Sequence, residues 1–481
     1  MSERSTVGGG LDAHGNPITA DRDTVARYDA AIDQLLRFDP AVIDTAAALT
    51  GGDDTPAPMG LALGAYLLLS STDPHGLDQA RALHASLADT AGNERERLHA
   101  AAIGTWLDGS WTGAAAVLDE VLVRWPTDLV AVIMGHQLDF FVGDAHSLRD
   151  RPLRTLGELD PDHPHAGYVR GMAAFGLEEA GHYERALDAG LAAVAANEDD
   201  VWAIHAVAHT HEMVGSVADG IRFMTVDHTS WGARNLFTVH LWWHLALYHL
   251  EAGRTDEVLA VYDAEIRHPG SVDAPFPMLD AASLLWRLHL DGVDVGDRFA
   301  VIADAWRTQL DAGGWFPFND VHAVMAHVGA GRLADARAVV DRMTVAAAVS
   351  SSAVAVADAA ITAEVGLPVG RAVLAHGEAR YGHAVAELLP IRRQVHRIGG
   401  SHAQRDVVQR TLVDAALRDG QLDLARALIA ERLALRDTSV YAWAQRARLL
   451  AARRDPDGAA EAAATAERHR RALAADGRGR A

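Results

Sequence analysis

The sequence has no cysteine and no lysine, so all 43 residues counted as Lys or Arg are arginine. Without cysteine there are no disulfides, no cysteine-ligated zinc and no thiolate nucleophile. Without lysine there is neither a Schiff base nor the phosphate-binding lysine of a P-loop. Catalysis would therefore have to use His, Asp, Glu, Ser, Thr, Tyr or Arg side chains, or a bound metal.

Other common signatures are missing as well. The sequence contains no G-x-S-x-G motif and no G-x-G-x-x-G motif after a strand. A formal net charge of -22 opposes the neutralisation of phosphates, so we expect no nucleic-acid partner. The longest mostly apolar run, Gly60 to Leu69, is too short to span a bilayer, and the first residues lack the apolar core of a signal peptide. We expect a cytoplasmic protein without a membrane partner, and its Ala- and Arg-rich composition is typical of a GC-rich bacterial genome.

A short turn recurs along the chain at intervals of about 34 residues. Gly109 and Gly143 are 34 residues apart, as are Gly181 and Gly215, and Gly253 follows 38 residues later. Further turns are expected at Gly331, Gly420 and Arg454. Ala, Leu and Arg dominate the segments between the turns, with apolar residues spaced at three and four, which is typical of helices. A helical repeat of this length is typical of tetratricopeptide proteins.

The sequence therefore predicts an all-α protein, a right-handed tetratricopeptide superhelix of stacked helix pairs. We expect one domain over residues 24–465, an irregular segment over residues 1–23 and a frayed tail over residues 466–481.

Two neighbouring segments carry a notable set of histidines. His205, His209 and Glu212 would lie on one face of a helix, within roughly 60° of one another. His240 and His244 repeat the same four-residue interval in the next repeat. Because ionisable side chains are costly to bury without a partner or a ligand, these five residues are the candidate catalytic residues.

Several long segments resemble the tetratricopeptide repeat protein 38 family. They are GMAAFGLEEAGHYERAL (171–187), DVWAIHAVAHTHEM (200–213), WWHLALYHLEAGRTDEVLAVYD (242–263), FNDVHAVMA (318–326) and IGGSHAQRDV (398–407). With the similar opening DAHGNPITA, the resemblance runs from near residue 12 to about residue 435. The resemblance implies the repeat fold, and it implies no particular activity.

The repeat register predicts where the candidate residues point. In tetratricopeptide proteins the second, fifth, ninth and twelfth slots of the first helix line the concave groove. With Val201 in the first slot, the fifth, ninth and twelfth slots hold the three candidates of the earlier helix. With Val239 first, the second and sixth slots hold His240 and His244. Neighbouring first helices pack about 8–10 Å apart, so we expect the five side chains to converge in a polar pocket between residues 165 and 410.

Three interpretations of these residues remain open. In the first, a divalent Zn, Mn or Fe ion is held by His205, His209, His240 and His244, with Glu212 or Glu178 completing the shell. In the second, one histidine acts as a base, a carboxylate orients it and an arginine holds an anionic substrate. In the third, the histidines are structural or line a groove that docks a partner chain without chemistry.

Other side chains are predicted to line the same pocket and bind the substrate. Asp320 also fits a simple helix cap, and Ser401 before His402 and Arg405 also fits a plain capping loop. The predicted substrate-binding residues are Glu178, Glu179, Trp243, His322, Asp320, His402 and Arg405.

Two functions compete on this evidence. The first is a superhelix whose pocket binds a small polar molecule or a short peptide and, as an enzyme, transforms it by acid–base or metal-assisted hydrolysis. The second is a non-catalytic interaction scaffold. An enzyme should close over a confined cavity with the five side chains converging, whereas a scaffold should present an open groove of solvated side chains.

Overall fold

The computed structural model describes residues 9–51, 56–226, 231, 235–309, 314–348 and 359–476. Within these residues the chain is helical apart from one short hairpin, in which β1 (Gly9–Leu11) pairs with β2 (Pro17–Thr19) in antiparallel register. The chain forms two compact units. Unit 1 comprises residues 1–207, 233–238 and 349–359, and unit 2 comprises the remainder through residue 481.

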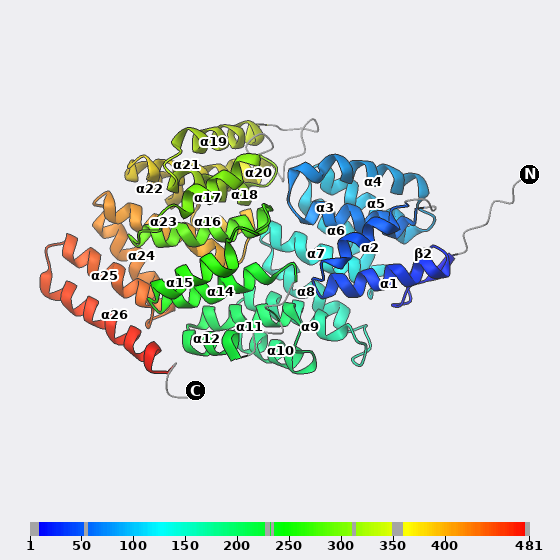
Figure 1. Ribbon diagram of the computed structural model, residues 1–481, viewed down its shortest axis with the longest axis horizontal. Helices are drawn as coiled ribbons and strands as arrows, with labels where there is room; N and C mark the ends of the chain where they lie inside the picture. Colours follow the sequence, from blue (N-terminus) through cyan, green and yellow to red (C-terminus); the bar gives the residue numbers. More distant parts are fainter. Residues whose placement is uncertain are drawn as a thin grey trace, which may run out of the picture. The chain divides into compact units, whose positions relative to one another are not determined.

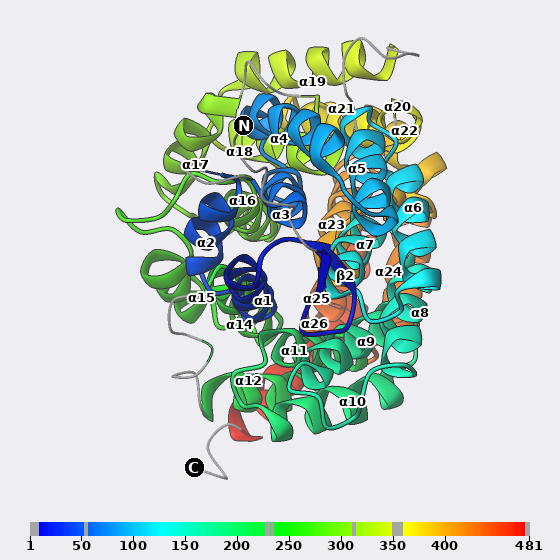
Figure 2. The ribbon, with the colours of Figure 1, turned by 90° about the vertical axis from the view of Figure 1, so that its right-hand side faces the viewer.

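Unit 1 is built from antiparallel helix pairs, and each helix packs on the next along the chain. Figure 2 shows this succession from α3 through α8. Its helices are α1 (Arg22–Leu36), α2 (Ala41–Leu49), α3 (Pro58–Ser70), the short η1 (Pro74–Gly76), α4 (Leu77–Thr90), α5 (Glu94–Leu107), α6 (Trp111–Arg124), α7 (Leu129–Val142), α8 (Ala145–Leu156), α9 (Ala166–Glu179), α10 (Tyr183–Ala196) and the first half of α11 (Val201–Val214).

Unit 2 begins inside α11, and its helices stack in the same way. They continue with α12 (Val217–Val226), α14 (Thr238–Glu251), α15 (Thr255–Val261) with η2 (Tyr262–Ile266), α16 (Pro275–Leu290), α17 (Arg298–Trp306) with η3 (Arg307–Gln309), α18 (Pro317–Gly329), α19 (Leu333–Ala348), α20 (Ala359–Ile361) with η4 (Thr362–Gly366), α21 (Leu367–Gly377), α22 (Tyr381–Ile391), η5 (Val395–Ile398), α23 (His402–Arg418), α24 (Leu422–Leu435), α25 (Val440–Ala452) and α26 (Pro456–Asp476).

The predicted turn residues occupy the turns between helices. Glycine adopts a positive φ without the steric cost of a Cβ atom, which is why it recurs where one helix reverses into the next. Arg454 takes the same conformation, with a φ of 62°, although it carries a side chain. The predicted glycines with a positive φ are Gly109, Gly143, Gly181, Gly215, Gly253, Gly331 and Gly420.

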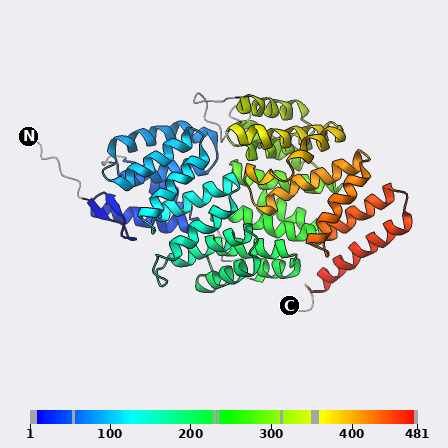
Figure 3. The same cartoon turned by 180° about the vertical axis from the view of Figure 1, so that it is seen from behind.

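The first and last helices of unit 2 contact each other. Arg436 donates to the backbone carbonyl of Glu212 over 3.1 Å, and Arg254 donates to that of Leu473 over 3.1 Å. The Ser439 hydroxyl donates to Glu251 over 2.7 Å. Figures 1 and 3 show the red helix α26 returning beside the green α12, which it contacts. The helices of unit 2 therefore enclose an interior.

The domain organisation differs from the expected single repeat region. The described part of the predicted irregular segment forms the hairpin, because the buried Arg95 binds Asp12 at 3.1 Å and the carbonyl of Pro17 at 3.1 Å. At the other end, α26 continues to Asp476, well into the predicted tail. Residues 1–8 and 477–481 lie outside the described residues. Among the described residues, no helix is long and apolar enough to cross a membrane.

Candidate functional site

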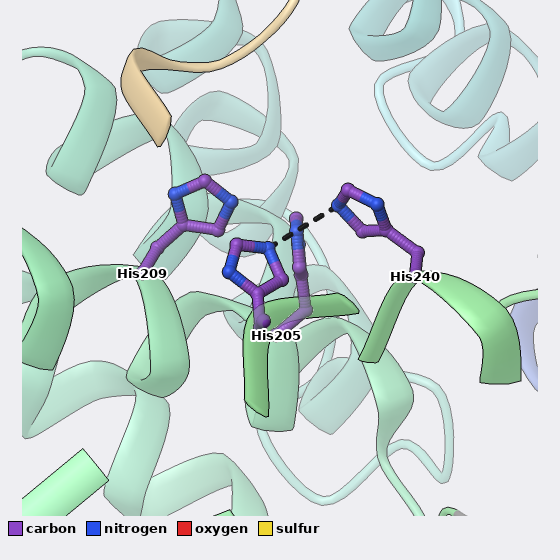
Figure 4. Close-up of side chains that lie close together, drawn as sticks. His205, His209 and His240 are labelled. Atoms are coloured by element: carbon purple, nitrogen blue, oxygen red, sulfur yellow. Dashed lines mark hydrogen bonds between the residues drawn. The ribbon is translucent and has the colours of Figure 1, made fainter. Parts of the chain in front are cut away.

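The helices α11 and α14 bring three of the predicted histidines together inside unit 2. His209, His240 and His244 are buried, with exposed fractions of 0%, 3% and 0%. Each offers a ring nitrogen, and these nitrogens lie within 4.8 Å of one another. The ring centroids of His209 and His244 are 4.3 Å apart. We call these three residues the central histidines; Figure 4 shows two of them, His209 and His240, with His205 one turn before His209.

Carboxylates lie beside the Nδ1 atoms of two central histidines. His240 Nδ1 is 2.9 Å from Asp280 Oδ2, and the Asp280 side chain is fully buried on α16. His244 Nδ1 is 3.4 Å from Glu212 Oε2, at the end of α11. The Nε2 atoms of the same two rings face each other at 3.2 Å. A carboxylate beside one nitrogen and a shared space at the other is the usual environment of a metal-binding imidazole.

The contact between the two Nε2 atoms has a consequence for protonation. A neutral imidazole has one donor and one acceptor nitrogen. If His240 and His244 both point Nδ1–H at their carboxylates, both Nε2 atoms are acceptors, and a proton or a cation must lie between them. Burial and the neighbouring His244 hold the pKa of His240 well below its usual value, so an additional proton on the ring is disfavoured at neutral pH.

Asp280 provides another place for the proton. Burial raises the pKa of its carboxyl well above the usual range, although His244, Gln404 and Arg287 oppose this shift. A protonated Asp280 donates to His240 Nδ1, so that the ring carries its own proton on Nε2 and donates to His244. Without a cation, Asp280 and His240 therefore act as one coupled pair that holds a proton.

Trp243 supports this arrangement. Its ring stacks on His240 with centroids 5.2 Å apart and an interplanar angle of 14°. Its Nε1 donates to the hydroxyl of Ser283 over 3.1 Å, and the Arg287 guanidinium lies 5.4 Å from its ring centroid. Burial and the neighbouring Arg410 lower the pKa of Arg287 to about 10, so this side chain remains charged at neutral pH. Trp243 therefore fixes the plane of the His240 ring beside a buried positive charge.

Two predicted pocket residues lie on α18. His322 is buried, and its Nδ1–H donates to the carbonyl of Phe318 over 2.7 Å. Burial lowers the pKa of His322 to about 4, and the nearby Arg287 lowers it further, so the ring is neutral. Asp320 instead accepts hydrogen bonds from the backbone N–H of Gly314 at 3.1 Å and 3.2 Å. It holds the segment before α18, which is a structural contact.

The start of α23 forms a capping box. Ser401 Oγ accepts from the backbone N–H of Gln404 over 3.2 Å, and the Gln404 side chain accepts from the N–H of Ser401 over 3.0 Å. His402 is the first residue of the helix and is half-buried. Arg405 donates to the carbonyl of Gly400. These bonds satisfy the loop internally, as expected of the capping alternative.

Three of the predicted residues belong to unit 1. His205 lies on the part of α11 that precedes the unit boundary, and its ring contacts Phe175 and Phe237 with centroids 4.9 Å away in each case. Glu178 and Glu179 end α9, with exposed fractions of 0% and 6%. Unit 2 thus brings together four of the five predicted catalytic residues, His209, Glu212, His240 and His244, and joins Trp243 to them.

The sequence analysis missed Asp280 and Arg287. A signal for Asp280 exists in the repeat register, because α16 begins at Pro275 and Asp280 takes the sixth slot. His244 and His322 were assigned to that slot of their own helices from the sequence. No comparable signal distinguishes Arg287 from the many surface arginines.

Comparison with known proteins supports the fold class. No family model matches this chain. It is similar to a structure of the human IFIT1 dimer with m7Gppp-AAAA, at 10% identity and a TM-score of 0.40 over 95% of each chain. It is also similar to the APC/C hetero-tetramer Cut9–Hcn1, at 12% identity and a TM-score of 0.28 over 93% of this chain and 95% of the other. The fold is that of a tetratricopeptide-type helical repeat protein; likenesses at these values carry no argument about function.

Proposed function

We propose that the central histidines bind a divalent transition metal, and that unit 2 uses the metal to bind and hydrolyse a small polar molecule or a short peptide. The observation that carries the proposal is the pair of Nε2 atoms 3.2 Å apart, each on a ring whose Nδ1 lies beside a carboxylate. Three imidazoles suit Zn²⁺ and leave a coordination position for a ligand, as in catalytic zinc sites.

The surrounding residues have matching roles. Asp280 and Glu212 orient His240 and His244 through their Nδ1 atoms, and the buried Arg287 supplies a positive charge for an anionic group of the ligand. A divalent metal bound here would polarise a carbonyl group and lower the pKa of a water ligand toward about 7. The neutral His322 can exchange a proton within this interior.

The rival function is a non-catalytic interaction scaffold with structural histidines. Its supporting observation is that the central histidines are buried and bonded among themselves. Against it, a scaffold binds through solvated groove residues, and these side chains are not solvated. A finer proposal concerns ancestry: on the segments quoted above, we infer that the chain is a divergent member of the tetratricopeptide repeat protein 38 family.

Elemental analysis of purified protein tests the metal proposal. We expect stoichiometric metal at the central histidines, and we expect His244→Ala to lose one equivalent. His249→Ala is the matched control, since His249 is a half-buried histidine on the same helix that lies outside the cluster. If His244→Ala keeps the metal content and folded state of the wild type, the metal proposal is wrong.

A second assay separates hydrolysis from simple metal binding. Zinc-loaded wild-type protein is incubated with a panel of dipeptides and nitrophenyl esters, and product release is compared with that of His244→Ala and His249→Ala. Activity confined to the wild type and the His249 variant supports a hydrolase. Equal background rates in all three, with metal still bound by the wild type, would leave a metal-containing scaffold as the function.

A further inference from the structure

Unit 1 contains a second group of three histidines, far from one another in the sequence. His14 lies in the turn between β1 and β2, and His163 and His165 lie in the connection between α8 and α9. Each offers a ring nitrogen, and the three nitrogens lie within 4.8 Å of one another. The ring centroids are 5.0 to 5.2 Å apart. The fold therefore brings three imidazoles from two separate segments into one cluster.

The hydrogen bonds around the rings leave one nitrogen of each for a shared ligand. His14 Nε2 lies 3.0 Å from His165 Nδ1, and the other nitrogen of His165 lies 3.4 Å from Asp33 Oδ1 on α1. The Nδ1 atom of His163 accepts from the backbone N–H of His165 over 3.1 Å, which leaves its Nε2 for a cation. Asp33 has the position of a carboxylate that orients a metal-binding imidazole.

Protonation favours ligand binding at this cluster. Burial, followed by the charges of His165 and His163, lowers the pKa of His14 to about 4. Burial and His163 also lower the pKa of His165. The rings are therefore mostly neutral at pH 7, and a neutral imidazole is the form that binds metals. All three side chains are half-buried, so solvent and ions reach them.

The backbone around His14 is already fixed in place. The Thr127 hydroxyl donates to the carbonyl of His14 over 3.0 Å, and the backbone N–H of Ala13 donates to Asp29 over 3.0 Å. Asp12 accepts from the backbone N–H of Asn16 over 2.9 Å and closes the turn. A cation would therefore meet a preformed set of ligands instead of having to order a loose segment.

We propose that His14, His163 and His165 form a second metal site, which takes a divalent transition cation such as Zn²⁺ and fastens the N-terminal hairpin to the connection between α8 and α9. Imidazole ligands suit Zn²⁺, Cu²⁺ and Ni²⁺, and a water molecule can complete a tetrahedral shell. The site is structural, because it joins two segments of unit 1. It is independent of the function proposed for the central histidines.

Titration with zinc chloride tests the site in a His244→Ala background, which removes the proposed central site. We expect about one equivalent of zinc to bind, and we expect His14→Ala and His163→Ala each to abolish this binding. His146→Ala, an exposed histidine on α8, is the matched control and should bind zinc normally. Asp33→Asn should weaken binding by about 10- to 100-fold, the usual effect of losing an orienting carboxylate.

Hydrogen exchange gives a second readout that does not depend on stoichiometry. Zinc should slow the exchange of the hairpin amides, including that of Asn16, in the His244→Ala protein and not in its His14→Ala derivative. If His14→Ala and His163→Ala leave zinc stoichiometry and hairpin exchange unchanged, the proposal is overturned. The same holds if the His244→Ala protein binds no zinc while remaining folded by circular dichroism. Should His244→Ala fail to fold, the comparison is made in the wild-type chain, where each variant should lower the stoichiometry by one.

Discussion

Replacing Asp280 by Asn tests the coupling between the central histidines and their buried carboxylate. Asn has nearly the same shape and can still accept from His240 Nδ1, which lies 2.9 Å from the carboxylate, but it carries no charge. We expect the variant to fold and to bind zinc about 10- to 100-fold more weakly. That loss corresponds to about 1.4–2.7 kcal/mol of binding free energy. Competition with a chromophoric chelator at pH 7 measures it.

The same variant should change how stability depends on pH. Because burial raises the pKa of Asp280, the metal-free folded protein keeps a proton that the unfolded chain loses above about pH 4. The contribution of Asp280 is therefore fully present at low pH and is lost as the pH rises through the folded-state pKa. Within that window the wild type should lose up to about 1.4 kcal/mol of unfolding free energy per pH unit relative to Asp280→Asn.

Urea unfolding of the metal-free proteins across this pH range measures the difference. Taking the wild type minus the variant removes the contributions of other titrating groups. Asp341→Asn, at an exposed position of α19, is the control and should follow the wild type. If Asp280→Asn leaves both the zinc affinity and the pH profile unchanged, the proposed coupling of Asp280 and His240 is wrong.

The remaining predictions concern single side chains. Glu212→Gln should weaken zinc binding by no more than about tenfold, since its contact with the central histidines is longer at 3.4 Å; chelator competition tests this. Ala379→Gly should raise the unfolding free energy by roughly 1 kcal/mol, because Ala379 has a φ of 56°, while Gly331→Ala should lower it by about 1 kcal/mol, because a Cβ there meets no other atom and only the φ of 72° resists it. Denaturant titration showing the opposite signs would contradict both. Arg95→Ala should cost about 3–5 kcal/mol, because it leaves the carboxylate of Asp128 buried without its 2.7 Å partner; a loss below 1 kcal/mol in thermal or urea unfolding would contradict this.

Much of the fold could be predicted from turn spacing and helical periodicity. The register also located two helix starts, since α11 begins at Val201 and α18 at Pro317. Two turns were missed: Gly292 has a positive φ but lies at a longer spacing, and Ala379 adopts a positive φ without being glycine. Sequence spacing identifies a turn only when both the interval and the residue type are regular.

The site was harder to predict because its contacts join distant segments. Helical spacing correctly paired His209 with Glu212 and His240 with His244, since these contacts depend on single helices. It did not indicate how closely the helices approach, so residues assigned to a groove are in fact buried. The partnership of Asp280 with His240 spans 40 residues, and that of His14 with His165 spans 151. No local pattern encodes contacts of this range.

Anomalous X-ray diffraction from crystals of the zinc-loaded protein, collected at the zinc absorption edge, tests the central claim most directly. We predict a strong peak about 2.0–2.1 Å from the Nε2 atoms of His240 and His244 and from a ring nitrogen of His209. Absence of density there, with the two Nε2 atoms still in contact at full zinc occupancy of the solution, would contradict a metal site at the central histidines.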